Sequence, residues 1–264
     1  MKIKKMLKRF IDKNFIKKPK LREVFTLILY GTRDVEVNIF GVKLKINKLK
    51  ENGYFRASKK IENSSLLEHE IPVVMSLISQ MQDGGCFVDV GANVGVFSSV
   101  FAKSAKLFNG FSTLAFEVNP ETFLRLKANA SSNGFEAFNF GISNSEKKIK
   151  FVEGAVSHVT TTIEKKNQYS IKERIFWAEC KPLDMILKDK KDIILKIDVE
   201  GQENDVLDGA RHLFETKRIK AIYIDGYDDP AVWKKLNEQF YLFDGRTLHA
   251  ANETTFCLLG LRKQ

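Results

Sequence analysis

The fold of this 264-residue chain is decided by the stretch Asp89-Val90-Gly91-Ala92-Asn93-Val94-Gly95, which follows a short apolar strand and opens a helix. We expect the strand over residues 86–90 and the helix over residues 96–103. Glycines between them let the backbone turn tightly and let a ligand approach where a Cβ atom would clash. The stretch therefore predicts a strand–loop–helix unit with a nucleotide-like ligand at the loop.

Asp89 discriminates between classes of ligand. The glycine spacing is not G-x-G-x-x-G, which disfavours a dinucleotide with its pyrophosphate on the helix N-terminus. An acidic side chain before the glycines repels a phosphate but suits an ammonium group or ribose hydroxyls. S-adenosylmethionine carries an amino group, a sulfonium and no phosphate, so this cofactor fits the loop better.

A second carboxylate, Glu117, ends the next expected strand, over residues 113–118. A carboxylate at this place can accept hydrogen bonds from both hydroxyls of a ribose. The alternative is that Asp89 caps the helix and Glu117 is a solvated strand end. Two acids at consecutive strand ends favour the cofactor interpretation over that alternative.

Strands and helices alternate through residues 86–264. The expected strands span residues 86–90, 113–118, 135–142, 193–197 and 219–224, and the expected helices span residues 96–103, 121–131, 183–187, 203–215 and 231–240. Residues 241–243 and 256–259 can add an antiparallel pair. Repeated strand–helix units with apolar strands predict a Rossmann-like α/β domain, a mostly parallel sheet covered by helices on both faces.

Two further segments precede this domain, so the expected division is a basic amphipathic leader helix over residues 1–22, an extension over residues 23–85 and the α/β domain over residues 86–264. Within the extension we expect a hairpin over residues 35–46, a loop around Asn52-Gly53 and a helix over residues 70–81. Residues 147–180 of the α/β domain, with strand-like ends, are interpreted as an insertion or edge element.

The positive charge of the chain is concentrated in the leader. The chain carries 43 Lys and Arg against 33 Asp and Glu, a net charge of +10. Residues 1–22 hold ten of the basic side chains and one acid, which leaves 33 basic and 32 acidic side chains elsewhere. This balance argues against a protein that is basic all over, such as a histone-like binder. The leader itself suits an anionic membrane surface or a nucleic acid, unless its apolar stripe packs on the body or on a second subunit.

The expected cellular setting follows from hydropathy and from the cysteines. No stretch of the sequence approaches the roughly 18 apolar residues of a membrane span. The three cysteines, Cys86, Cys180 and Cys257, are far apart and lack the spacing of metal ligands. They indicate reduced thiols in the core. We therefore expect a cytoplasmic protein, whose leader can place it peripherally at a membrane surface.

Three stretches of this chain carry a resemblance to a known family: Phe87–Gly95, Phe116-Glu117-x-Asn119-Pro120 and Leu195-Lys196-Ile197-Asp198-Val199-Glu200-Gly201-Gln202-Glu203. They resemble the FkbM family of class I S-adenosylmethionine-dependent methyltransferases, and the last stretch is the one that points to this family. The resemblance covers roughly residues 86–226. It implies a seven-stranded sheet with one antiparallel strand, and methyl transfer usually to hydroxyls of sugars or secondary metabolites.

The resemblance also implies cofactor contacts, position by position. The residues that would line the methionine part of the cofactor are Asp89, Gly91, Ala92, Asn93 and Gly95. Glu117 would hold the ribose, with Asn119 beside it. Ile142 and Ser143, after the third strand, would flank the adenine.

Lys196, Asp198 and Glu200 share one face of a strand end, because apolar residues alternate with them. They lie at the C-terminal edge, where open α/β sheets bind ligands. In a catalytic interpretation these three residues act on the acceptor, with Asp198 or Glu200 as the general base. In a second interpretation Asp198 binds Mg²⁺ together with Asp225 and Asp228, just beyond the next strand. In a third, Lys196 pairs with an acid and Glu203 caps the helix that follows Gly201.

The sequence thus predicts an S-adenosylmethionine-dependent O-methyltransferase that acts on a hydroxyl of a sugar, a glycan or a secondary metabolite. The main rival is an RNA ribose 2′-O-methyltransferase guided by the leader, although the body lacks a basic surplus. The absence of an Asn-Pro-Pro-Tyr-like motif and of a Pro-Cys pair argues against methylation of RNA bases. A non-catalytic, cofactor-binding scaffold is the non-enzymatic alternative.

Overall fold

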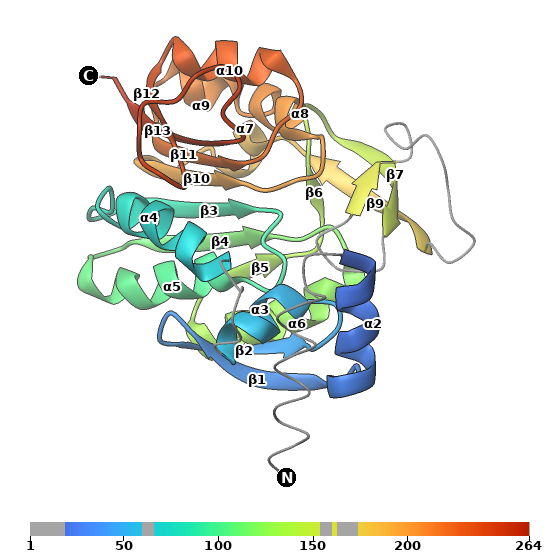
Figure 1. Ribbon diagram of the computed structural model, residues 1–264. Helices are drawn as coiled ribbons and strands as arrows, with labels where there is room; N and C mark the ends of the chain where they lie inside the picture. The colour runs from blue at the N-terminus through green and yellow to red at the C-terminus, as the bar shows by residue number, and fades with distance from the viewer. Residues whose placement is uncertain (1–18, 60–65, 154–159, 163–173, 264) are drawn as a thin grey trace.

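The computed structural model describes residues 19–59, 66–153, 160–162 and 174–263 of the chain (Figure 1). The expected leader, up to residue 18, lies outside the described residues.

The centre of the molecule is a seven-stranded sheet. Its strands are β3 (Cys86–Val90), β4 (Ser112–Phe116), β5 (Glu136–Phe138), β10 (Ile193–Ile197), β11 (Ile219–Asp225), β12 (Phe240–Asp244) and β13 (Cys257–Arg262). Their order across the sheet is β12-β13-β11-β10-β3-β4-β5. The neighbours from β11 to β5 pair in parallel, and β13 runs antiparallel to both β11 and β12. The predicted Rossmann-like α/β fold with one antiparallel strand is confirmed.

Apolar layers on the two faces of the sheet form the core. The helices of the α/β domain are α5 (Val96–Ser104), η1 (Ala105–Leu107), α6 (Pro120–Asn133), α7 (Leu183–Ile186), α8 (Glu203–Asp208), α9 (Arg211–Glu215) and α10 (Pro230–Asn237). Side chains alternate along a strand, so Val88 and Leu195 pack with α7 to α10, whereas Phe87 and Ile194 pack with α5. The same alternation places the polar side chains of Asp89 and Lys196 on the α5 face.

Two helices illustrate how local sequence sets the elements. Helix α6 begins at Pro120, and the side chain of Asn119 accepts hydrogen bonds from the backbone N–H groups of Glu121 and Thr122. The single helix expected over residues 203–215 is wrong, since the chain divides it at Gly209. A Cβ atom on Gly209 would lie 2.1 Å from the carbonyl oxygen of Ser143, which follows β6. No side chain therefore fits at this break between the two helices.

The N-terminal extension contains a hairpin between helices. Its elements are α2 (Pro19–Tyr30), β1 (Asp34–Ile39), β2 (Val42–Asn47), α3 (Asn52–Ser58) and α4 (Leu66–Ile78). The hairpin and the last helix, α4, were predicted, and the hairpin is confirmed with Ile39 paired to Val42. The loop expected around Asn52-Gly53 is wrong, because α3 forms there and buries Phe55 against Tyr30 with ring centroids 5.1 Å apart.

Buried contacts join the extension to the α/β domain. Phe55 belongs to the same apolar cluster as Phe97 of α5. Arg125 of α6 donates to the carboxylate of Glu51 at 2.8 Å, and both side chains are buried. The side-chain oxygen of Asn129, also on α6, accepts from the backbone N–H of Lys45 in β2 at 2.7 Å. The extension and the α5 face of the sheet therefore share one core.

The insertion forms a second sheet beyond the ends of the central strands (Figure 1). Its strands are β6 (Gly141–Ile142), β7 (Lys147–Glu153), β8 (Thr160–Thr162) and β9 (Arg174–Lys181), in the order β6-β9-β7-β8. The single strand expected over residues 135–142 is wrong, because it divides into β5 and β6, which belong to different sheets. The strand-like ends predicted for the insertion correspond to β7 and β9.

Two sequence expectations concern the whole chain. Across the described residues, none of the helices is both long enough and apolar enough to cross a membrane. Cys86, Cys180 and Cys257 are free and buried, as predicted for core thiols.

The contact between Arg125 and Glu51 yields a stability prediction. Replacing Arg125 by leucine removes a guanidinium group that donates to the buried Glu51 carboxylate, and we expect the free energy of unfolding to fall by about 3–5 kcal/mol. Urea unfolding followed by circular dichroism measures this loss. The matched control, Asp34→Asn, removes one charge of the exposed pair with Lys45 and should cost less than about 1 kcal/mol. Equal losses in the two variants would contradict the prediction.

Candidate active site

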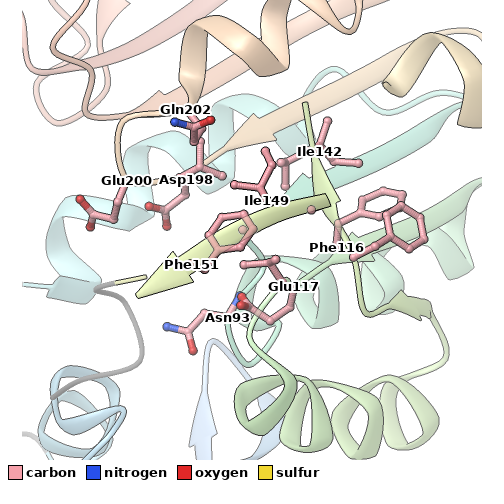
Figure 2. A pocket seen from close by; sticks show the side chains of 15 residues that line it. Asn93, Phe116, Glu117, Ile142, Ile149, Phe151, Asp198, Glu200 and Gln202 are labelled. Atoms are coloured by element: carbon pink, nitrogen blue, oxygen red, sulfur yellow. The ribbon is translucent and has the colours of Figure 1, made fainter. Parts of the chain in front are cut away.

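A pocket opens at the C-terminal edge of β3, β4 and β10, under the inner face of the insertion sheet (Figure 2). The space between its walls, part of which is open to solvent, is about 720 Å³. The lining residues are Val90, Gly91, Asn93, Phe116, Glu117, Val118, Phe140, Gly141, Ile142, Ile149, Phe151, Asp198, Val199, Glu200 and Gln202. Asp198 and Glu200 stand together at one end of this pocket, and Phe116 and Ile142 stand at the other (Figure 2).

Gly91 lets the loop after β3 pass against the end of β10. Its φ angle is +75°, and a Cβ atom there would lie 1.9 Å from the carbonyl oxygen of Asp198. The backbone N–H of Gly91 donates to the carbonyl oxygen of Phe116, and that of Asp198 donates to the carbonyl oxygen of Val90. The glycine is therefore required by close packing between strand ends, in addition to any approach of a ligand.

Glu117 lies at the bottom of the pocket beside Asn93 (Figure 2). One carboxylate oxygen accepts from the backbone N–H of Asn93 at 2.9 Å, and the other accepts from that of Asn119 at 2.8 Å. Burial raises the pKa of Glu117 to about 7, although the two N–H donors lower it. Each oxygen keeps a lone pair for a further donor. The carboxylate is thus built to accept two hydroxyl groups, as those of a ribose.

Asp89 lies behind the loop rather than on the pocket wall. It is fully buried, and its carboxylate accepts from the hydroxyl of Ser98 at 2.6 Å. The ammonium group of Lys196 lies 3.3 Å from the other oxygen of Asp89 and 3.1 Å from Asp198. Lys196 also stands over the ring of Phe97, 5.2 Å from its centroid. The charge of Asp89 is therefore already balanced within the protein.

Lys196 keeps its charge in this buried place. Burial lowers the pKa of its ammonium group, but the carboxylates of Asp198, Asp89 and Asp225 raise it, and the net direction is upward. The predicted pairing of Lys196 with an acid is therefore confirmed, with Asp89 and Asp198 as its partners. Lys196 is not part of the pocket wall, and its ammonium group reaches the pocket through its contact with Asp198.

Asp198 and Glu200 form the acidic end of the pocket, on neighbouring positions of the turn after β10 (Figure 2). The Asp198 side chain is 41% exposed, so a solvent-borne acceptor can reach it. Removal from water raises the pKa of Asp198 to about 6; Lys196 opposes this rise and Asp225 adds to it. Removal from water and the carboxylate of Asp198 raise the pKa of Glu200 to about 7. These shifts bring both pKa values closer to neutral pH, where a general base is most effective.

The opposite end of the pocket is apolar. Ile149 and Phe151 of β7 face Ile142 and Phe116 across it (Figure 2). The ring of Phe116 stacks on that of Phe138 with centroids 5.2 Å apart, which fixes its position. Such walls suit a planar base. The alternation of apolar and polar residues in β7 could have indicated one buried face, but not that this face covers the pocket.

The structure brings some of the predicted cofactor residues onto the pocket wall and places the others behind it. On the wall are Gly91, Asn93, Glu117 and Ile142. Behind it are Asp89, Ala92, Gly95, Asn119 and Ser143. Asn119 acts through Glu117 and through the cap of α6. Gly95 packs so closely that a Cβ atom would lie 2.7 Å from Leu126.

The magnesium interpretation receives no support from the arrangement of the acids. Within the described parts of the chain, no group of three or more His, Cys, Asp or Glu side chains is placed to hold a metal ion. The carboxylate of Asp198 binds the ammonium group of Lys196, and that of Asp225 accepts from the thiol of Cys257 at 3.0 Å. Asp198, Asp225 and Asp228 therefore do not form the expected ligand set, and no step of the chemistry is assigned to a metal.

Comparison with known proteins is consistent with this geometry. The family model described as the methyltransferase FkbM domain matches residues 89–243, from the glycine loop to β12. The hexuronic acid methyltransferase AglP of Haloferax volcanii is 27% identical over 176 residues, which cover 65% of this chain and 70% of AglP.

Solved structures show weaker likenesses. A TehB-like S-adenosylmethionine-dependent methyltransferase from Corynebacterium glutamicum is 12% identical with a TM-score of 0.41, over 81% of this chain and 98% of that one. The tRNA (uracil-54, C5)-methyltransferase of Pyrococcus abyssi, in complex with S-adenosyl-L-homocysteine, is 13% identical with a TM-score of 0.43, over 88% of this chain and 45% of that one. These scores are too low to support an argument, and the fold rests on the strand order of this chain.

The close packing at Gly91 predicts a loss of stability on substitution. Gly91→Ala and Gly84→Ala both place a side chain at a positive φ angle, which costs roughly 1–2 kcal/mol. In the described structure nothing lies within 4 Å of a Cβ atom at Gly84, whereas one at Gly91 meets the Asp198 carbonyl at 1.9 Å. We expect Gly91→Ala to lower the free energy of unfolding by about 1–3 kcal/mol more than Gly84→Ala. Similar urea unfolding curves for the two variants would refute this.

Proposed function

Because this chain belongs to the FkbM methyltransferase family, we propose that it transfers the methyl group of S-adenosylmethionine to a hydroxyl group of a sugar or a glycan. Family membership establishes the coarser statement, that the chain is an S-adenosylmethionine-dependent methyltransferase. The single observation that carries the proposal is the position of the half-exposed Asp198 carboxylate in the same pocket as Glu117. The similarity to AglP, whose name states a hexuronic acid as its substrate, supports a sugar acceptor.

The pocket offers a place to each part of the cofactor. Glu117 would accept the ribose hydroxyls, because both its oxygens keep a free lone pair. Ile142 and Phe151 would enclose the adenine, and Gly91 and Asn93 would border the methionine part. S-adenosylmethionine, when bound, supplies an electrophilic methyl group.

The residues behind the wall complete the proposed cofactor site without touching the pocket. These residues are Asp89, Ala92, Gly95, Asn119 and Ser143. We infer that they keep the glycine loop, Glu117 and the adenine end of the pocket in place. Asp89 acts by holding Lys196, which in turn holds Asp198.

Asp198 is the proposed proton acceptor. Methyl transfer needs the acceptor oxygen aligned with the methyl group and its proton removed. The Asp198 carboxylate is open to the pocket and is held on one side by Lys196 at 3.1 Å. Glu200 stands beside it as a second carboxylate that can receive the proton.

A glycan acceptor also gives the basic leader a proposed role. Residues 1–22 carry ten basic side chains and one acid, and each Lys or Arg near an anionic lipid surface adds about 1 kcal/mol of attraction. The leader would bring the enzyme reversibly to a membrane that carries lipid-linked glycans.

The acceptor class is tested by methyl transfer from labelled S-adenosylmethionine. The acceptors are methyl glucopyranoside, methyl glucopyranosiduronate and a mixed-sequence oligoribonucleotide. We expect label in a sugar as an ether that survives mild alkali, and a loss of at least about 100-fold in kcat for Asp198→Asn, since general bases contribute about that much or more. Label in the oligoribonucleotide alone would establish RNA 2′-O-methylation instead, and label released by alkali would indicate a methyl ester.

The ionisation of Glu117 predicts how cofactor affinity depends on pH. The ionised carboxylate accepts ribose hydroxyls, and the pKa of Glu117 is raised to about 7 by burial. Affinity for S-adenosylhomocysteine should therefore fall as the pH falls through about 7, approaching tenfold per pH unit in the acidic range. Isothermal titration calorimetry measures it. Glu117→Gln, which cannot ionise, should bind weakly with no such dependence, and an unchanged pH profile in this variant would disprove the assignment.

A further inference from the structure

The N-terminal extension places a buried carboxyl group in the first turns of α4. Glu70 is 9% exposed, and one of its oxygens accepts a hydrogen bond at 3.0 Å from the hydroxyl of Tyr54 in α3. The other oxygen, Oε2, is buried and has no hydrogen-bond partner among the described residues. A buried polar atom without a partner costs free energy, so a polar group of a ligand would find a prepared site there.

The packing of α4 brings Glu70 to the acceptor end of the site. Val73, one turn beyond Glu70, is buried. Its side chain packs against Gly245, the residue directly after β12, so closely that a Cβ atom on Gly245 would lie 3.1 Å from it. Val73 and Leu77 share an apolar cluster with Tyr223 of β11. The start of α4 therefore lies at the edge where β10 and β11 end, the edge that carries Asp198.

The charged groups around Glu70 are those of this edge. They are Lys196 and Asp198 at the end of β10 and Asp225 at the end of β11, together with the Tyr54 hydroxyl from α3. The charges of Asp198 and Asp225 also act on the hydroxyl of Tyr54. Two elements of the extension thus place polar side chains near enough for the charge of Asp198, the carboxylate that we propose as the proton acceptor, to act on them.

The chemical state of Glu70 follows from these surroundings. Burial raises its pKa to about 8; Tyr54 and Lys196 lower it, and Asp225 and Asp198 raise it further. The carboxyl group is therefore mostly protonated at neutral pH. Since Oε1 accepts from Tyr54, the proton belongs on Oε2, where it is a donor without an acceptor in the described structure.

We propose that Glu70 and Tyr54 form an acceptor-binding subsite, in which Oε2 of Glu70 donates a hydrogen bond to a hydroxyl or ring oxygen of the sugar whose neighbouring hydroxyl faces Asp198. This inference rests on the proposed function of the chain. It assigns the selection of the acceptor to the extension, and the binding of the cofactor to the loop after β3.

The test uses the full chain and the sugar that the wild-type enzyme methylates. Glu70→Ala should raise the KM for the sugar about tenfold, the cost of one hydrogen bond, with kcat changed less than about threefold. Glu70→Gln, whose amide still donates, should stay within about threefold of the wild-type KM. Tyr54→Phe should fall between them, and the matched control Glu36→Gln, at an exposed position of β1, should match the wild type.

Two further measurements separate binding of the sugar from folding and from cofactor binding. Affinity for S-adenosylhomocysteine should be the same in Glu70→Gln, Tyr54→Phe and the wild type, and the unfolding temperature of Glu70→Gln should match that of the wild type. The KM of the wild type for the sugar should rise above a pH of about 8, as Glu70 loses its proton, and that of Glu70→Gln should not. If Glu70→Ala fails to fold, these two variants and the pH profile carry the test.

Each outcome bears on one proposal. A wild-type enzyme that methylates no sugar overturns the proposed function. A wild type that methylates a sugar, with an unchanged KM in Glu70→Ala or Tyr54→Phe, overturns the subsite alone. A loss of S-adenosylhomocysteine affinity equal to the loss in sugar binding also overturns it, because Glu70 would then act on the cofactor.

Discussion

The ammonium group of Lys196, buried between the carboxylates of Asp89 and Asp198, is the interaction on which the site depends. Removing a charge from water costs several kcal/mol unless partners compensate for it. Lys196 in β10 lies directly opposite Asp89 in β3, so the ion pair joins the two central strands of the sheet. The strand pairing and the hydrogen bond from the Asp198 N–H to the Val90 carbonyl continue this joint to the strand ends, where Gly91 passes against the Asp198 carbonyl without a side chain.

This arrangement separates the two tasks of a methyl-transfer site. At one end, Ile142 and Phe151 border an apolar space that suits a base. Glu117 lies at the bottom of the pocket, where its two oxygens accept hydrogen bonds from the backbone N–H groups of Asn93 and Asn119. At the other end, Asp198 and Glu200 stay partly exposed with pKa values raised to about 6 and 7. Holding a ligand and moving a proton are thus carried by different side chains of one pocket.

The extension takes part in this division of tasks. Its buried pair of Glu51 and Arg125 and its shared apolar cluster make it continuous with the α5 face of the sheet. On the same face, α4 brings Glu70 to the edge where Lys196 and Asp198 lie. A segment that precedes the glycine loop in the sequence therefore borders the acceptor side of the site.

Local sequence was sufficient to predict the first and last residues of β3 and β10. Each is a short apolar run followed by a polar turn, a pattern that is typical of a buried strand. It also predicted that Gly91 and Glu117 border the pocket, because parallel strands end at one edge. The ion pair of Asp89, the pocket wall formed by Phe151 and the place of Glu70 depended on packing between distant segments. The partner of a buried charge is set by which strands and helices come together, and the pattern of residues around that charge in the chain does not contain this information.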